Sequence, residues 1–223
     1  MRYLIVIAHP DDEALGAGAS IHKWAREGNE VAVAILSGHA AARINRSDTL
    51  AEDEQKAMAI LGIKQSYHAQ FPNIKMNTVP HLELVQFIES CIEDWHAEVI
   101  VTHHPTDTNN DHAMVSGAAQ AACRMFQRRP GVTPLKELMY MEVLSATEWS
   151  LAPAADRFVP NTFVEVGKEG MDVKLEALKA YHGVMRPYPH PRSEEAILGL
   201  AAYRGAQAGR MYVEAFESVF RSI

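Results

Sequence analysis

The first part of the chain alternates between short apolar runs and longer segments with helical spacing, and this alternation constrains the fold more than any other feature. The apolar runs predict strands at 3–8, 30–37, 65–71 and 97–104. Helical spacing separates them at 15–27, 49–61, 80–95 and 112–127. Gly28 and Gly62 directly follow two of these segments as helix stop signals. Strands that alternate with helices of about 10–15 residues form βαβ units, and therefore a parallel sheet covered on both faces.

The remainder of the chain is less regular. We expect strands at 138–145 and 162–167 and helices at 171–183 and 194–208, whereas 211–220 has no clear assignment. No second alternating unit and no low-complexity linker interrupts the sequence. The prediction is one α/β domain over residues 1–223: a Rossmann-like parallel sheet, flanked by helices on both faces, with an elaborated C-terminal part.

Charge and hydropathy narrow the partners that such a domain would have. The formal net charge is −7 and no segment concentrates Lys and Arg, which argues against a nucleic-acid partner. No apolar run reaches the ~20 residues of a membrane span, and the run at 3–8 is too short for a signal peptide. Cys91 and Cys123 fall in apolar helical patterns and are expected to be buried free thiols. We expect a cytoplasmic protein, with a homo-oligomer as an open alternative.

Histidines and carboxylates gather at the ends of two expected strands. The first strand is followed by His9, Asp11, Asp12 and Glu13, and the fourth by His103, His104, Asp107, Asp111 and His112. Ligands of open parallel sheets bind beyond the carboxyl ends of the strands. If these two strands are neighbours, both clusters converge on one mouth of the sheet.

A divalent metal would explain why carboxylates follow a core strand so closely. Buried carboxylates repel one another and are costly without a cation among them. Catalytic zinc sites commonly use three protein ligands, with imidazole nitrogen and carboxylate oxygen among the preferred donors. His9, a nearby carboxylate and His112 would form such a set, with His103 and His104 as rival ligands. The alternative is that the acidic run is only a solvated helix N-terminus, where carboxylates favour the helix dipole.

Two motifs resemble a known family. AHPDDE at 8–13 and THHPTDTNNDH at 102–112 are similar to motifs of the PIG-L/LmbE-like zinc-dependent N-deacetylases. FPNIKMN at 71–77 resembles the substrate loop of that family, and YRGAQAGRMYVEAF at 203–216 resembles a tail found in many members. The similarity covers most of the chain and implies a single LmbE-like deacetylase domain.

The resemblance implies a ligand set and a reaction. His9, Asp12 and His112 would hold one Zn²⁺ per chain, although another divalent metal is possible, and Asp11 would be the general base. Water activated by the metal would attack an acetamide on a sugar or sugar conjugate, such as N-acetylglucosamine, and release acetate and an amine. The protein would then be a carbon-nitrogen bond hydrolase acting on linear amides.

The sequence departs from the family pattern where many members carry a histidine three residues before the last ligand. This chain has Asn109 there, which can donate a hydrogen bond to an oxyanion but cannot act as an acid. His190, in YPHPRS, is the expected replacement as general acid. The alternative for His190 is an ordinary loop histidine.

Substrate contacts also differ from the family pattern. Asn73 stands where an aspartate is common, and it would still bind a sugar hydroxyl. Leu50 takes the place of an arginine, and Arg46 or Arg43 of the preceding loop would then fill the role of that arginine. Arg204 would either clamp a carboxylate or phosphate of the substrate or form a structural ion pair.

Two carboxylates are expected to support the metal ligands. Asp107 would orient a ligand histidine or act as a turn residue, and Glu13 would lie behind the ligands. Other functions remain open: an amidase that cleaves a larger sugar-linked amide, or a non-catalytic Rossmann-like nucleotide- or sugar-binding protein. Against the binding protein, no G-x-G-x-x-G follows the first strand, and the acidic turn would repel a phosphate. Stoichiometric zinc would separate the two classes.

Overall fold

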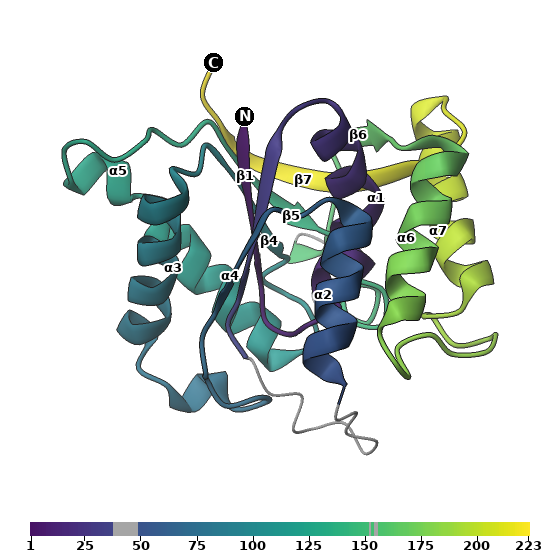
Figure 1. Ribbon diagram of the computed structural model, residues 1–223, viewed down its shortest axis with the longest axis horizontal. Helices are drawn as coiled ribbons and strands as arrows, with labels where there is room; N and C mark the ends of the chain where they lie inside the picture. Colours follow the sequence, from purple (N-terminus) through teal and green to yellow (C-terminus); the bar gives the residue numbers. More distant parts are fainter. Residues whose placement is uncertain (38–48, 152, 154–155) are drawn as a thin grey trace.

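The protein has an α/β fold, in which one mixed β-sheet is covered by helices on both faces (Figure 1). The structure, a computed structural model, describes residues 1–223 apart from 38–48, 152 and 154–155. The strands are β1 (Arg2–Ile7), β2 (Glu30–Ile35), β3 (Gln65–His68), β4 (Val99–His103), β5 (Glu137–Met141), β6 (Thr162–Glu165) and β7 (Val213–Arg221). The helices are α1 (Asp12–Arg26), α2 (Leu50–Leu61), the short 3₁₀ helix η1 (Met76–Thr78), α3 (His81–Trp95), α4 (Asn110–Ala122), α5 (Met125–Arg128), α6 (Gly167–Ala180) and α7 (Glu194–Ala208).

The strand order is β3-β2-β1-β4-β5-β7-β6. The strands from β3 to β5 pair in parallel, as the alternation predicts. β1 pairs with β4, and Val6 lies opposite Thr102, so the two histidine- and carboxylate-rich strand ends meet at one edge. The expected neighbourhood of these strands is therefore confirmed.

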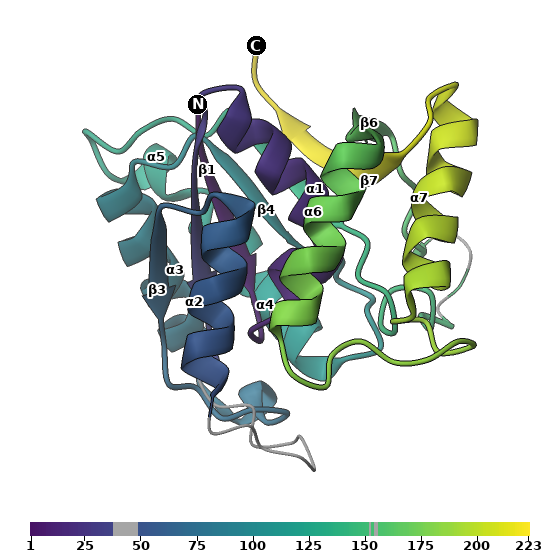
Figure 2. The same ribbon diagram turned by 45° about the vertical axis from the view of Figure 1, so that its right-hand side comes forward.

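Successive side chains of β1 divide the core into two layers. Ile5 and Ile7 belong to the layer beneath α1, α2 and α6, with Leu175 of α6 in the same cluster. Leu4 and Val6 point to the opposite face and join the cluster beneath α3 and α4. Figure 2 shows the two helical layers on either side of the sheet. Burial on both faces explains why the strand reads as a continuous apolar run rather than an alternating one.

The C-terminal part differs from the sequence prediction. β7 runs antiparallel to both β5 and β6, so the sheet is parallel only over its first five strands. Segment 211–220, which has no clear assignment from sequence, supplies most of β7. Gly209 ends α7 with φ 68°, and the chain turns back across the sheet edge within a few residues. The connection from β6 to β7 contains two helices, α6 and α7, rather than the single crossover helix of a βαβ unit, and β7 enters the sheet antiparallel to β6.

Two helix boundaries also shift. α1 begins at Asp12 rather than at residue 15, which places Asp12 and Glu13 in its first turn. The expected helix at 112–127 is divided into α4 and α5. Cys91 and Cys123 are buried free thiols, as expected.

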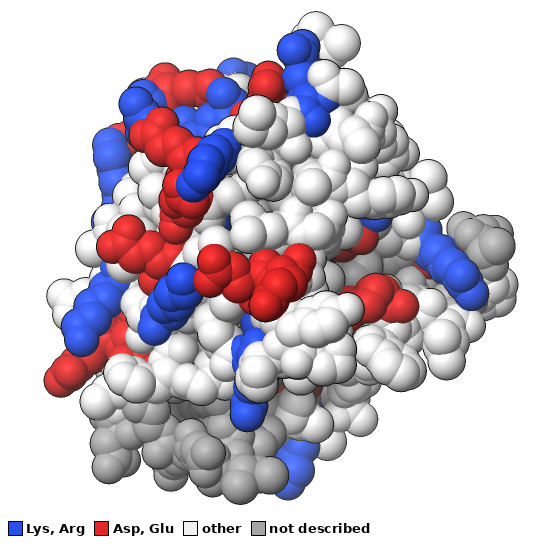
Figure 3. All heavy atoms as spheres, turned by 90° about the vertical axis from the view of Figure 1, so that its right-hand side faces the viewer, with Lys and Arg blue, Asp and Glu red and all other residues white. Residues whose placement is uncertain are grey.

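Helix length and surface charge bear on the partners of the protein. Among the residues that the structure describes, no helix combines the length and apolarity needed to cross a bilayer. On the face that carries α6 and α7, acidic and basic side chains are interspersed rather than gathered into one basic surface (Figure 3).

Candidate metal centre

The turn between β1 and α1 brings His9 and Asp12 together. The main-chain N–H of His9 donates to Asp12 Oδ2 at 2.9 Å, and the Asp12 N–H donates to the His9 carbonyl oxygen at 3.3 Å. The second half of the centre is His112, in the first turn of α4 beyond β4. Both helices begin at the carboxyl edge of the sheet, where ligand sites of open α/β sheets lie.

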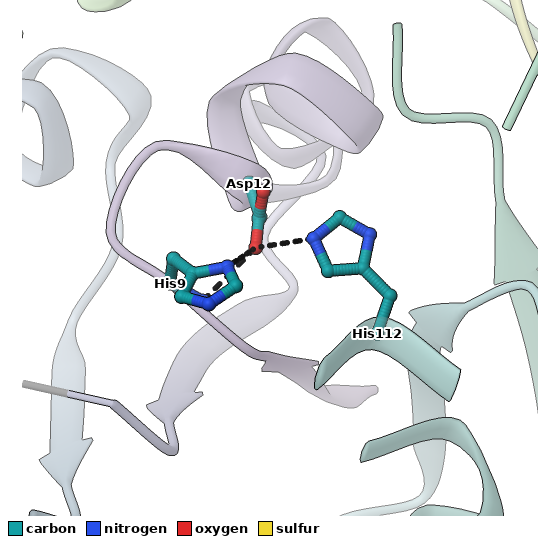
Figure 4. A group of neighbouring side chains, drawn as sticks. All are labelled: His9, Asp12 and His112. Atoms are coloured by element: carbon teal, nitrogen blue, oxygen red, sulfur yellow. Dashed lines mark hydrogen bonds and ion pairs between the residues drawn. The ribbon is translucent and has the colours of Figure 1, made fainter. Parts of the chain in front are cut away.

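Asp12 lies between the two histidines (Figure 4). Its Oδ2 is 3.4 Å from His9 Nδ1 and 3.4 Å from His112 Nε2. All three side chains are buried, and one ligand atom from each lies within 4.8 Å of the others. Two imidazole nitrogens and one carboxylate oxygen are a donor set that suits Zn²⁺, with a fourth position left for water or substrate. The residues present therefore fit a catalytic metal.

A second carboxylate holds each of these histidines from behind. Asp111 Oδ2 lies 2.9 Å from His9 Nε2, and Asp107 Oδ2 lies 3.0 Å from His112 Nδ1. Such contacts fix the ring orientation and leave the opposite nitrogen to face the metal. Asp107, expected to orient a histidine or to act as a turn residue, contacts His112, whereas sequence reasoning gave Asp111 no role.

The rival histidines are engaged elsewhere. His103 Nε2 accepts a hydrogen bond from the Ala8 N–H at 2.9 Å, which occupies its lone pair. Its ring stacks on that of His112 at 3.8 Å with 19° between the planes. In-plane lone pairs of rings stacked this way cannot converge on one ion at about 2 Å. The alternative group of His103, Asp107 and His112 is therefore the poorer site. His104 faces Glu217 of β7, with its Nε2 3.5 Å from that carboxylate.

The electrostatics of the metal-free chain follow from this geometry. Burial alone would lower the pKa of His9, but hydrogen bonds to Asp111 and Asp12 outweigh it and raise the pKa to about 9. Burial is likewise outweighed at His112, where Asp12 and Asp107 raise the pKa to about 10. Burial opposes the charge of Asp12, yet His112 and His9 hold its pKa well below the ordinary value. The site thus assembles negative charge that attracts a cation, whether protons or a metal.

Asp11 adjoins Asp12 but has a different backbone conformation. Its φ of 98° lies in the left-handed region, which is strained for a residue with a side chain. Asp11 Oδ2 is 3.4 Å from Arg192 Nη1, and Arg192 Nε donates to Ser145 Oγ at 2.8 Å. The sharp change of direction between Asp11 and Asp12 allows the two carboxylates to take different roles.

Glu13 is buried behind Asp11. Its Oε2 accepts from the Asp11 N–H at 3.1 Å, and its Oε1 accepts from the Tyr181 hydroxyl at 2.7 Å. Burial raises the pKa of Glu13 to about 8, although the hydrogen bond from Tyr181 opposes the shift. Glu13 therefore joins the turn that carries Asp11 to Tyr181.

The asparagines expected to contact substrate lie on two neighbouring loops. Asn109 is the N-cap of α4, where its side-chain oxygen accepts from the Asp111 N–H at 3.0 Å and leaves the amide N–H groups as donors. Asn73 precedes Ile74, whose N–H donates to Asp111 at 2.5 Å. The same carboxylate therefore connects the Asn73 loop to His9.

The other predicted contact residues are less directly connected to the centre. His190 is exposed, and its Nδ1 accepts from the Arg192 N–H at 3.0 Å within its own loop. Burial, followed by the charges of Arg192 and Arg186, lowers the pKa of His190. Arg204 forms an ion pair with Glu142, through bonds of 2.7 and 3.0 Å, which matches the structural alternative. Arg46 and Arg43, expected as substrate contacts, lie outside the described residues.

Sequence reasoning missed three contributors to the site. Asp111 had a usable signal, because it is a carboxylate in the first turn of the helix that carries His112. Tyr181 and Arg192 had none, since they approach Glu13 and Asp11 from about 170–180 residues away in sequence.

Two comparisons with known sequences both point to deacetylases. The model of the PIG-L family, described as GlcNAc-PI de-N-acetylase, matches residues 4–123. A protein of Escherichia coli (strain K12) described as "Uncharacterized deacetylase YaiS" is 30% identical over 188 residues, which cover 80% of this chain and 89% of the relative.

Solved structures show that this fold carries more than one reaction. The N,N′-diacetylchitobiose deacetylase of Pyrococcus horikoshii matches with a TM-score of 0.79 at 17% identity, covering 98% of this chain and 83% of the other. GalB of Pseudomonas putida KT2440, a 4-carboxy-2-hydroxymuconate hydratase, matches with a TM-score of 0.78 at 20% identity, covering 100% and 97%. At such identities the likeness concerns the fold.

Proposed function

The chain belongs to the PIG-L family of deacetylases, and from this premise we propose that it is a zinc-dependent hydrolase that removes the acetyl group from an N-acetylated sugar or sugar conjugate. The observation that carries the proposal is the arrangement of two carboxylates on one turn. Asp12 lies between His9 and His112, where it would be a ligand, while the carboxylate of the adjacent Asp11 lies 3.4 Å from Arg192 instead.

We assign His9, Asp12 and His112 as the residues that would hold the zinc. A zinc ion bound there would lower the pKa of water to about 7 and polarise the acetamide carbonyl. Asp107 and Asp111 would keep the two imidazoles oriented through their other nitrogens.

Asp11 is the proposed general base. It would accept a proton from the attacking water while the water oxygen bonds to the acetyl carbon. The C–N bond would then break, the nitrogen would gain a proton, and the products would be acetate and a free amine. We propose His190 as the proton donor to that nitrogen and Asn109 as a hydrogen-bond donor to the oxyanion.

The substrate class rests on the family and on the loops around the centre. The family description and the chitobiose deacetylase both name N-acetylated sugars. Asn73 lies on a loop joined to the centre through Asp111, which suits contact with a sugar hydroxyl. An amidase that cleaves a larger sugar-linked acyl group at the same metal is the alternative.

Acetate release tests the proposal. Zinc-loaded protein should release acetate from at least one member of a panel of N-acetylated sugars and nucleotide sugars, and chelator-treated protein should not. Because one protein of similar fold is a hydratase, both acetate and primary amine must be measured. Deacetylation produces them in equal amounts. Absence of acetate from every member of the panel would contradict the proposed function, and release of longer acids alone would favour the amidase.

A further inference from the structure

The main chain at Asp11 requires support. Its φ of 98° and ψ of −22° place a residue with a Cβ in left-handed backbone at the N-cap of α1. The side chain of Asp11 does not cap the helix. Strained backbone of this kind persists only where surrounding contacts hold it, and such strain is concentrated at functional sites.

One contact that holds this backbone is Glu13. The Asp11 N–H donates to Glu13 Oε2 at 3.1 Å, and both residues are buried, with exposed fractions of 2% and 0%. A buried N–H needs an acceptor, and the left-handed turn at Asp11 directs its N–H toward this carboxylate. The orientation of Glu13 therefore sets the orientation of the Asp11 main chain.

Tyr181 holds Glu13 in turn. Tyr181 is the C-cap residue of α6, its side chain is 1% exposed, and its hydroxyl donates to Glu13 Oε1 at 2.7 Å. In its ionised form Glu13 thus receives one donor at each oxygen, the Asp11 N–H and the Tyr181 hydroxyl. The chain of contacts runs from the C-terminal end of α6 to the main chain of Asp11.

We propose that Tyr181 is a positioning residue for the general base, acting through Glu13 on the main chain of Asp11. The inference rests on the proposed function, in which Asp11 is the base. Like His190, Tyr181 lies outside residues 4–123, which the family model matches.

Loss of the Tyr181 hydroxyl should displace the base without disturbing the metal ligands. Buried Glu13 would lose a donor and rotate to find another, so its hold on the Asp11 N–H would weaken. Arg192 would still contact the Asp11 carboxylate, which makes a partial effect the expectation. A small displacement of a catalytic group lowers the rate of the chemical step strongly, whereas it changes substrate affinity little.

The test compares Tyr181→Phe with Tyr3→Phe. Tyr3 is also a buried tyrosine, but it lies on β1 at the opposite end of the sheet, where its ring stacks on Trp24. In Tyr181→Phe we expect kcat to fall about tenfold, with KM and zinc content unchanged. Nuclear magnetic resonance should show faster hydrogen exchange at the Asp11 amide. Tyr3→Phe should leave kcat and the exchange rate of the Asp11 amide at the wild-type level.

A double-mutant cycle establishes the route of the effect. In an Asp11→Asn background the base is already absent, so Tyr181→Phe should cause no further loss of kcat. An equal loss in both backgrounds, or wild-type kcat and wild-type Asp11 amide protection in Tyr181→Phe, would overturn the inference. Glu13→Leu, which removes both acceptor oxygens, should reproduce the faster exchange at Asp11.

The two proposals fail in different ways. A wild-type protein that releases no acetate from any N-acetylated sugar would remove the proposed function. The exchange rate of the Asp11 amide would still decide whether Tyr181 holds the main chain there.

Discussion

Asp111 immediately precedes His112, yet its carboxylate contacts His9, the other histidine of the candidate metal centre. It contacts His9 Nε2 and also accepts from the N–H groups of Ile74 and Met76, at 2.5 and 3.0 Å. One residue therefore orients His9 and anchors the loop that carries Asn73. Its burial lets it do both, because no water competes for its oxygens.

Replacement of Asp111 should weaken metal binding although it is not a proposed ligand. Asp111→Asn keeps the shape but puts an N–H₂ group against these donors, so the His9 ring loses its fixed orientation. We expect the zinc dissociation constant to rise by about 10- to 100-fold. Competition with a chromogenic chelator measures it, with Asp94→Asn on the exposed side of α3 as control. Equal affinities in the two variants would contradict this role.

Zinc binding should depend on pH through His9 and His112. Their pKa values of about 9 and 10 mean that both rings are protonated in the metal-free chain at neutral pH. A ligand nitrogen must be deprotonated, so zinc displaces protons and apparent affinity rises as the pH rises toward these values. Asp12 needs no such step, because its pKa lies well below the ordinary value.

The expected magnitude is about two protons released per zinc bound near pH 7. Titration calorimetry in buffers of different ionisation enthalpy gives the number directly. An affinity that does not change between about pH 6.5 and pH 8.5 would mean that the rings are neutral before zinc arrives, contrary to the carboxylate contacts described above.

At the scale of elements, α1 connects the site to the C-terminal part of the chain. Lys174 of α6 donates to the Leu15 carbonyl oxygen at 2.7 Å and to Glu214 of β7 at 2.6 Å. Glu214 also accepts from the Ala19 and Ser20 N–H groups, at 3.2 and 2.6 Å. A buried ion pair therefore joins the middle of α1, the helix that begins with Asp12, to α6 and β7.

Lys174→Met should strongly destabilise the fold. It leaves the carboxylate of Glu214 buried without its cation, and breaking a buried pair in this way costs about 3–5 kcal/mol of the free energy of unfolding. Lys168→Met, on the same helix, removes an exposed pair with Asp172 and should cause no measurable change. Urea unfolding of both variants compares them. Similar midpoints for the two would show that the buried pair does not support α1.

The boundaries of α1 show what a hydrophobic pattern can and cannot predict. The apolar spacing starts at Leu15, so the pattern places the helix start there, whereas the structure starts it at Asp12. The acidic first turn is invisible to hydrophobic periodicity but is favoured by the helix dipole. Because α1 begins at Asp12, Asp12 has helical backbone, whereas Asp11 at the N-cap has left-handed backbone with φ 98°.

At the scale of the molecule, the sequence predicts the parallel part of the sheet, β1 to β5, because apolar runs and helical spacing in the local sequence define its strands and helices. The meeting of His9, Asp12 and His112 follows from two strand ends at one edge, together with the family motifs. The antiparallel β7 could not be predicted, since its pairing depends on tertiary contacts with β5 and β6. For the same reason Tyr181 and Arg192 gave no signal, although both reach the turn at 11–13.

The central claim is that neighbouring carboxylates divide two tasks, with Asp12 as metal ligand and Asp11 as general base. The most direct measurement is zinc content and acetate turnover of Asp11→Asn and Asp12→Asn, prepared side by side. Asp11→Asn should keep about one zinc per chain and lose roughly 10²-fold or more in kcat, whereas Asp12→Asn should lose both zinc affinity and activity. A zinc-free Asp11→Asn beside a zinc-loaded Asp12→Asn would reverse the roles, and a fully active Asp11→Asn would contradict the account.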